Sequence, residues 1–303
     1  MVDLSVEIAG IKLKNPTILA AGILGTTGES LKRVARAGAG AVTTKSIGLV
    51  PREGHPNPTV HETYKGLLNC MGLPNPGAEN FLEELKVAKE GGVPVIASIF
   101  GFNTKEFVEV AKIISRGNPD MIELNISCPN VEKGMIFGKD PKLAVEVTRN
   151  VKKVVDVPVI VKLTPNTDKL IEVAKAVEKA GADAISAVNT FGPGMVIDIE
   201  TATPVLSNVT GGLSGPAIKP LALKHVYELS DEVKIPIIGM GGIVTGEDAI
   251  EFLMAGASAV GIGTGIMYEG LEVFKKVCDG LRDFMLRKNY NSLSEIIGLA
   301  KGR

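Results

Sequence analysis

Eight short apolar runs alternate with longer amphipathic stretches, and this alternation limits the possible folds more than any other feature of the chain. Each run is almost continuously apolar, whereas a strand with one face in water alternates apolar and polar residues. The runs therefore predict parallel strands that are buried on both faces. They span residues 17–21, 41–45, 94–99, 121–126, 158–163, 183–189, 236–240 and 259–263.

The stretch that follows each run has helical periodicity. In residues 168–181, for example, Ile171, Ala174 and Val177 share one face, and Gly181 supplies a C-terminal stop. Eight strand and helix pairs predict an α/β fold of the (β/α)8 type, a TIM barrel. The chain of 303 residues suits one such barrel with enlarged loops, so we expect residues 1–303 to form a single domain.

Three segments fall outside the eight units. Residues 6–15 predict a hairpin that turns at Ala9-Gly10 and closes the N-terminal mouth of the barrel. Residues 47–76 and 190–216 are far longer than ordinary connections from strand to helix, and "VIDI" and "PVLSN" in the second predict a small hairpin. Because both segments follow strands, we expect them at the C-terminal face, where such barrels build their active sites.

Composition narrows the class of partner. The formal net charge is -1 and the isoelectric point is near 6.4, so the chain lacks the basic surplus of proteins that bind nucleic acid or anionic membranes. The N-terminus has no apolar signal-peptide core, and no apolar run reaches the roughly 18 residues of a membrane span. These features predict a cytoplasmic protein that acts on small molecules.

Polar residues gather at the predicted C-terminal ends of the strands, where a barrel presents side chains to a ligand. A single lysine at such a position commonly reaches solvent, and a single asparagine commonly makes a turn. The convergence of several such residues on one mouth indicates a shared site instead. They are Lys45, Ser46, Asn125, Ser127, Cys128, Lys162, Asn189 and Thr190.

The last two units carry glycine-rich turns, at residues 239–244 and 261–267. Glycines let the backbone approach a ligand, and N–H groups at a helix start point toward an anion, so the paired turns predict a phosphate site. A phosphorylated substrate and FMN both fit this pattern. With FMN, Lys162 would lie near the pyrimidine edge of the flavin and stabilise negative charge there. A Rossmann fingerprint is disfavoured, because these glycines lie in the last unit rather than the first.

The three cysteines are widely spaced and form no CxxC pair, which argues against a disulfide framework or a thiolate metal site. Cys128 stands in a polar segment directly before Pro129. A thiol whose pKa is modestly lowered is a workable general base at neutral pH, and we interpret Cys128 in this way rather than as a small buried hydrophobe. We expect Cys70 to line the site without acting and Cys278 to lie in the core.

The three histidines show no pairing typical of metal ligands or of a catalytic triad, and no metal site is predicted. Positions in a proline-rich or solvated loop are favoured for His55 and His61. A position on a helix surface is favoured for His225.

A series of motifs in fixed order identifies a family. It comprises "TTKSIGLVPREGHPNPTVHET", "LLNCMGLPNPG", "ELNISCPNV", "VKLTPN", "VNTFGPGMVIDIET", "TGGLSGPAIKP", "GMGGI" and "GIGTG". On these motifs the chain resembles, nearly end to end, the class 1 dihydroorotate dehydrogenases, and most closely the catalytic subunits of the NAD-linked B type. The class 2 enzymes have a serine base and an N-terminal membrane segment, and the sequence shows neither.

The resemblance implies that FMN lies over the barrel mouth and that dihydroorotate stacks on it. The implied cofactor contacts are Ala21, Lys45, Ser46, Ser98, Asn125, Lys162, Val188, Gly215, Gly241, Gly242, Gly263 and Thr264, with the phosphate on the last four. The implied substrate contacts are Lys45, Asn69, Met71, Gly72, Leu73, Asn125, Asn130, Asn189 and Thr190. Cys128 would take the C5 proton as the C6 hydride passes to the flavin, which gives orotate for de novo pyrimidine synthesis.

The resemblance also implies a partner chain. B-type enzymes pass electrons to NAD through a subunit that carries FAD and a [2Fe-2S] cluster, and the cysteine pattern for that cluster is absent from this sequence. The implied assembly is a homodimer of catalytic chains joined by two partner subunits. Two positions depart from the B-type pattern: Ser98 stands where a flavin-contacting asparagine is expected, and Cys70 replaces a small residue beside Asn69.

Other functions stay open from the sequence. Among flavoenzymes the nearest are the fumarate-linked A-type enzyme and other FMN-dependent pyrimidine reductases, such as the pyrimidine-reducing domain of dihydropyrimidine dehydrogenase. Enzymes that reduce uridine in tRNA share the architecture and a cysteine, but they need a basic face that a net charge of -1 does not indicate. A non-redox isomerase or lyase barrel would use the same glycine turns for a sugar phosphate.

Overall fold

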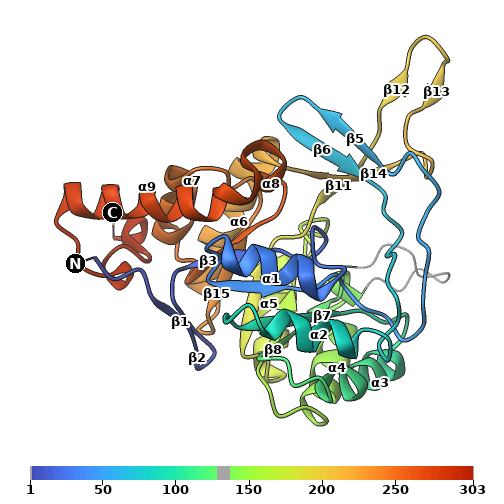
Figure 1. Ribbon diagram of the computed structural model, residues 1–303, viewed down its shortest axis with the longest axis horizontal. Coiled ribbons are helices and arrows are strands. Elements are labelled where there is room, and N and C mark those ends of the chain that lie inside the picture. The colour runs from blue at the N-terminus through green and yellow to red at the C-terminus, as the bar shows by residue number, and fades with distance from the viewer. Residues whose placement is uncertain (1, 128–136, 303) are drawn as a thin grey trace.

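The computed structural model describes residues 2–127 and 137–302, and eight parallel strands form a closed barrel at its centre (Figure 1). The strands are β3 (Thr17–Leu19), β4 (Ala41–Thr43), β7 (Val95–Ile99), β8 (Met121–Asn125), β9 (Val159–Lys162), β10 (Ala184–Ala187), β15 (Ile237–Met240) and β16 (Ala259–Ile262). They pair in chain order, and β16 pairs with β3 to close the ring. The predicted TIM barrel is confirmed, and each predicted strand forms within two residues of its expected ends.

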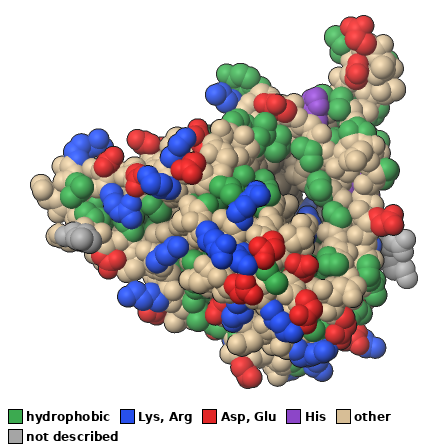
Figure 2. All heavy atoms as spheres, viewed as in Figure 1, with side chains coloured by type: hydrophobic (Ala, Val, Ile, Leu, Met, Phe, Trp, Pro, Cys, Tyr) green, Lys and Arg blue, Asp and Glu red, His purple; other side chains and the backbone are tan. Residues whose placement is uncertain are grey.

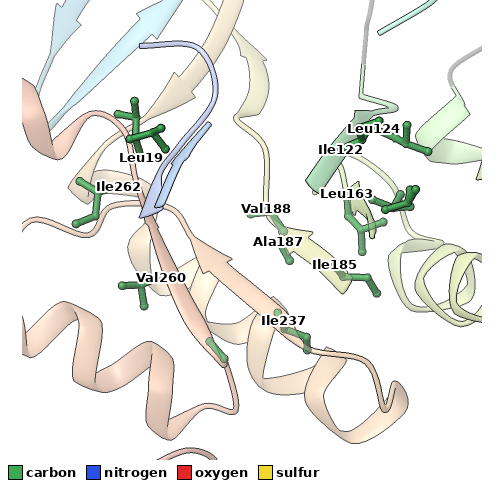
Figure 3. Packing of buried hydrophobic residues seen from close by; sticks show 14 of the residues in the cluster. Leu19, Ile122, Leu124, Leu163, Ile185, Ala187, Val188, Ile237, Val260 and Ile262 are labelled. Atoms are coloured by element: carbon green, nitrogen blue, oxygen red, sulfur yellow. The ribbon is translucent and has the colours of Figure 1, made fainter. Parts of the chain in front are cut away.

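Helices cover the outside of the barrel (Figure 1). They are α1 (Gly28–Arg36), α2 (Leu82–Lys89), α3 (Thr104–Ser115), α4 (Pro141–Lys152), α5 (Leu170–Lys179), α6 (Lys219–Glu232), α7 (Gly246–Met254), α8 (Gly265–Glu269) and α9 (Val273–Lys288). Strand side chains such as Ile122, Ile185 and Val260 belong to the buried cluster that packs beneath these helices (Figure 3). Since the opposite face of each strand is enclosed by the barrel, both faces are buried and mostly apolar, and this explains the nearly continuous apolar runs in the sequence.

The interior of the barrel has an apolar floor. Its inward side chains form a second buried cluster that includes Ile18, Ile96, Met121, Ile160 and Ile238. The hairpin of β1 (Val6–Ile8) and β2 (Ile11–Leu13) packs against this floor through Ile8 and Leu13, which have no exposed surface. The predicted hairpin is confirmed, and its turn at Ala9-Gly10 has positive φ at both residues.

The two long loops meet in a four-stranded antiparallel sheet. In spatial order its strands are β11 (Phe191–Gly194), β14 (Gly211–Ser214), β6 (Gly66–Asn69) and β5 (Val60–Thr63). A small hairpin of β12 (Ile197–Asp198) and β13 (Thr203–Pro204) projects beyond this sheet (Figure 1), which confirms a hairpin in the second loop. The sequence interpretation missed the β5–β6 hairpin. Its turn is tight, since Lys65 at the turn has a positive φ.

Short 3-10 helices complete the described structure: η1 (Phe137–Lys139), η2 (Pro216–Ile218), η3 (Gly270–Glu272), η4 (Leu293–Glu295) and η5 (Leu299–Lys301). On the face seen in Figure 2, basic and acidic side chains are interspersed over the helices, in keeping with a net charge of -1. Within the described residues, no helix combines the length and the hydropathy that a membrane crossing requires.

The packing of the hairpin predicts a difference between neighbouring residues. Leu13→Ala removes a fully buried side chain from the barrel floor, so we expect the free energy of unfolding to fall by about 2–4 kcal/mol. Lys12→Ala changes the exposed side of the same strand and should alter it by less than about 0.5 kcal/mol. Urea denaturation of both variants measures these values, and equal losses would show that the hairpin does not seal the barrel.

Candidate active site

A cavity of about 740 Å³ opens at the C-terminal ends of the barrel strands, bordered by the sheet of β11, β14, β6 and β5. This volume lies within the range of about 300–1,000 Å³ typical of small-molecule sites. The predicted site residues that line it are Ala21, Lys45, Ser46, Asn69, Met71, Gly72, Leu73, Asn125, Lys162, Val188, Asn189, Thr190, Gly215, Gly241, Gly242, Gly263 and Thr264. The fold thus brings together residues from almost the whole length of the chain, while their individual roles stay predictions.

Two lysines lie buried beside the cavity. Lys45 follows β4 and Lys162 ends β9, and their exposed fractions are 6% and 5%. The Nζ atom of Lys162 lies 3.9 Å from Oε1 of Glu123 on β8, whereas Lys45 forms no ion pair within the described residues. Burial, and secondly the charge of Lys162, lowers the pKa of Lys45 below its ordinary value of 10.5. An anion in the cavity would offset both causes, so this site favours negatively charged ligands.

Hydrogen bonds between side chains connect three strand ends at the cavity floor. The Asn125 amide donates to Ser46 Oγ at 3.0 Å, and the Asn189 amide donates to Asn125 Oδ1 at 3.4 Å. The backbone N–H of Thr190 donates to Asn189 Oδ1 at 2.8 Å. Each asparagine amide gives one N–H to this chain of bonds, which leaves its other N–H for the oxygen atoms of a ligand.

The end of β6 and the loop after it bring Asn69, Met71, Gly72 and Leu73 to another wall of the cavity. The Asn69 amide donates to the Gly212 carbonyl at 3.2 Å, which ties this wall to β14. Gly72 and Leu73 both have positive φ, so the backbone turns sharply at this point. A Cβ atom on Gly72 would lie only 2.6 Å from the His55 backbone nitrogen, so glycine lets this turn pack against the His55 segment.

The glycine turns converge at one end of the cavity. Gly215 and Gly242 both have positive φ, and a Cβ atom on Gly242 would lie only 2.8 Å from the Gly215 carbonyl oxygen, so a side chain there would prevent this approach. Thr264 Oγ1 donates to Ser214 Oγ at 2.7 Å, which joins the turn before α8 to the sheet. Exposed backbone N–H groups at such turns and helix starts suit a phosphate group.

Ser98 lies one layer below the cavity and does not line it. Its side chain has no exposed surface, because it points into the barrel from β7 and donates to Glu123 Oε1 at 3.0 Å. Its oxygen also lies 3.0 Å from Ser46 Oγ, which does line the cavity. Within the described residues, Ser98 therefore reaches the cavity only through Ser46, which differs from the direct flavin contact that the resemblance implies.

Cys128 and Asn130 lie outside the described residues, so their roles stay predictions. The residue before them, Ser127, lines the cavity, and its backbone N–H donates to Asn125 Oδ1 at 3.3 Å. Cys70 lines the cavity, as expected. Cys278 is buried among apolar residues, also as expected, and burial raises its pKa to about 11.

The structure adds residues that the sequence interpretation did not assign to the site. His55 lies in the proline-rich loop, as expected, but it also lines the cavity, where its Nδ1 lies 2.8 Å from the Cys70 carbonyl oxygen. Asn166 also lines the cavity and binds both sides of the segment after β10, donating to the Thr190 carbonyl and accepting from the Gly192 N–H. The position of Asn166 just beyond β9 could have indicated that it lies at the cavity. No feature of the sequence near His55 indicates the same for His55.

The chain shows extensive similarity to known proteins. The family model described as dihydroorotate dehydrogenase matches residues 3–285. Among curated proteins, the "Dihydroorotate dehydrogenase B (NAD(+)), catalytic subunit" of Methanocaldococcus jannaschii is 52% identical, with 98% of each chain covered. Proteins of the same name from Methanosarcina mazei and Pyrococcus furiosus are 53% and 49% identical and cover 97% and 99% of this chain and 94% and 99% of their own lengths.

The two buried lysines predict opposite effects on stability. Lys45→Met removes a buried cation that has no ion-pair partner among the residues the structure describes, so the ligand-free protein should gain about 1 kcal/mol or more at pH 7. Lys162→Met leaves the Glu123 carboxylate without its nearest cation, so that variant should lose about 3 kcal/mol. Thermal unfolding of both variants without ligand tests this contrast.

The gain from Lys45→Met should depend on pH. Because the pKa of Lys45 is lowered in the folded state, the unfolded state binds more protons between the lowered value and 10.5, and wild-type stability rises with pH across that window. The advantage of the variant should therefore be full below the lowered pKa and shrink as the pH rises from that value toward 10.5. A constant advantage across this range would show that Lys45 is not destabilised by its charge.

Proposed function

Because the chain belongs to the dihydroorotate dehydrogenase family, we propose that it oxidises dihydroorotate to orotate as the catalytic subunit of an NAD-linked enzyme. The observation that carries this proposal is the cavity, which has a glycine-lined end suited to phosphate and a floor of buried lysines and asparagine amides. Dihydroorotate is an anion rich in carbonyl oxygens, so cations and N–H donors suit it. The reaction is a step of de novo pyrimidine synthesis.

FMN fits this cavity on local chemistry. A side chain on Gly215 or Gly242 would collide with neighbouring protein atoms, so the glycines let the backbone turns come together at the cavity, and Lys162 would supply a cation beside the flavin. When bound, FMN would accept the hydride of the reaction. The residues proposed to hold it are Ala21, Lys45, Ser46, Asn125, Lys162, Val188, Gly215, Gly241, Gly242, Gly263 and Thr264, and Ser98 would act through Ser46.

The proposed substrate contacts surround the remaining part of the cavity. The amides of Asn69, Asn125 and Asn189 would donate to the substrate carboxylate and carbonyl oxygens, with Asn130, Thr190 and the backbone of residues 71–73 beside them. Lys45 would balance the substrate charge, which is consistent with its lowered pKa in the ligand-free protein. The narrow turn at Gly72 would let the backbone follow the flat ring closely.

Cys128 is the proposed general base. It would take the proton from C5 of dihydroorotate while the hydride leaves C6, so that a double bond forms between these two carbons. Ser127, directly before it, is anchored at the cavity by its bond to Asn125. This anchor supports a position for the thiol beside the substrate.

A partner subunit is proposed as the outlet for electrons. The name "catalytic subunit" of the relatives implies that another chain takes part. We propose that the partner carries FAD and a [2Fe-2S] cluster, passes electrons to NAD, and joins a homodimer of this chain in a heterotetramer with two copies of each. Within the described residues, no cluster of histidine, cysteine and acidic side chains could hold a metal ion.

The first test is an anaerobic visible spectrum of the purified chain loaded with FMN. We expect the flavin band to bleach when dihydroorotate is added. Recovery of the band by NAD only when the partner subunit is present would support the NAD-linked type. If fumarate restores the flavin band of the isolated chain, the fumarate-linked type is favoured. If the protein cannot take up FMN, a non-redox barrel is the remaining function.

The second test compares two cysteines. Cys128→Ala should keep bound FMN yet slow flavin reduction by dihydroorotate by about 100-fold or more at neutral pH, because the C5 proton then has no base. Cys70→Ala alters a cysteine that lines the cavity without a proposed chemical role, so its rate should stay within a few-fold of the wild type. Stopped-flow measurement of flavin reduction gives both rates, and a fast Cys128→Ala variant would remove the thiol from its proposed role.

A further inference from the structure

A buried carboxylate lies beneath the cavity, and neither the sequence motifs nor the proposed chemistry gives it a role. Glu123 points into the barrel from the middle of β8 and is 3% exposed. Ser98 Oγ donates to its Oε1 at 3.0 Å, and Ser186 Oγ donates to its Oε2 at 2.8 Å. Removing a charged group from water is costly, so a carboxylate in a barrel interior needs donors of this kind.

In the hydrogen bonds that lead away from Glu123, the donor and the acceptor of each bond are determined. Ser98 has one O–H and gives it to Glu123, so the Ser98 oxygen can only accept from Ser46 across their 3.0 Å contact. Ser46 in turn gives away its own proton and can only accept, and it does accept from the Asn125 amide at 3.0 Å. Because Glu123 accepts from both Ser98 and Ser186, it sets the direction of the Ser98 and Ser46 bonds, and the Ser127 N–H, which donates to Asn125 Oδ1 at 3.3 Å, holds Asn125 in the same orientation.

The same direction continues into the cavity. With its amide nitrogen held toward Ser46, Asn125 turns its carbonyl oxygen toward the Asn189 amide, which donates to it at 3.4 Å. Asn189 is held in the matching sense by the Thr190 N–H. If Asn125 turned over, its amide nitrogen would face the Asn189 amide and the Ser127 N–H, and donors cannot pair with one another.

We propose that Glu123 is a positioning residue of this site: as the terminal acceptor of the chain Ser98, Ser46, Asn125 and Asn189, it acts with the N–H groups of Ser127 and Thr190 to fix both asparagines with N–H groups toward the substrate. The role rests on the proposed function, since it concerns the orientation of the proposed substrate contacts. Lys162, 3.9 Å from Oε1, keeps positive charge on the side of the carboxylate that receives Ser98. Glu123 itself touches neither the cavity nor a ligand in it.

Two serines on neighbouring sides of the carboxylate provide a matched pair of variants. Ser98→Ala and Ser186→Ala each remove one hydroxyl donor from Glu123, and both serines have no exposed surface. Only Ser98 continues toward Asn125. In the FMN-loaded protein we expect Ser98→Ala to raise the dissociation constant of orotate by about tenfold or more, and Ser186→Ala to change it by less than about threefold.

Substitutions of Glu123 itself separate orientation from packing. In Glu123→Gln the amide oxygen can face Ser98 and Lys162 while the amide nitrogen donates to Ser186, so the direction is kept and orotate should bind nearly as in the wild type. Glu123→Met fills similar space without an acceptor, and orotate binding should weaken by about tenfold or more. Binding is read from the change that orotate causes in the flavin absorption spectrum, with FMN content as the check on folding.

The outcomes distinguish this role from the proposed function. If the wild-type chain binds neither FMN nor orotate, the proposed function fails. If it binds both, but Ser98→Ala and Ser186→Ala weaken orotate binding equally, or Glu123→Met binds orotate like the wild type, Glu123 is only structural. Should one serine variant not fold, the comparison of Glu123→Gln with Glu123→Met still decides the question.

Discussion

In the closed barrel, the alternation of side chains along each strand determines which residues face the interior and which pack against the helices. On β8, Met121, Glu123 and Asn125 point inward, whereas Ile122 and Leu124 pack against the helices. The three inward residues lie at three depths: an apolar floor, a polar layer and the cavity. A shift of one residue in this strand would place two apolar side chains at the polar depths and a carboxylate among the helices, so the register is strongly fixed.

The polar layer makes the cavity possible. Lys45 and Lys162 have exposed fractions of 6% and 5%, and burying such cations in an apolar interior is costly unless other groups balance their charge. Glu123 lies near one of them, and the serine hydroxyls satisfy the carboxylate in turn. The remaining positive charge is at the cavity, where a site for anions needs it. The ligand-free protein carries this arrangement at some cost in stability, as is common at functional sites.

The walls of the cavity depend on loops rather than on the barrel. Two loops far apart in the chain pair through β6 and β14, and Asn69 joins them by its bond to the Gly212 carbonyl. The close approach of Gly215 and Gly242 needs glycine at both positions, because each has positive φ and a Cβ atom on either would meet backbone atoms at less than 3.0 Å. The barrel therefore supplies charge and amides, while the loops supply shape.

The sequence by itself determined the barrel and the residues at its mouth. Continuous apolar runs indicate strands buried on both faces, and the polar residues that end them must converge, so Lys45, Asn125, Lys162 and Asn189 could be assigned without a structure. Only the tertiary structure placed His55 at the cavity, Ser98 below it and Glu123 at the end of a hydrogen-bonded chain. These positions depend on contacts between segments distant in the chain, and such contacts leave no periodic signal in a single sequence.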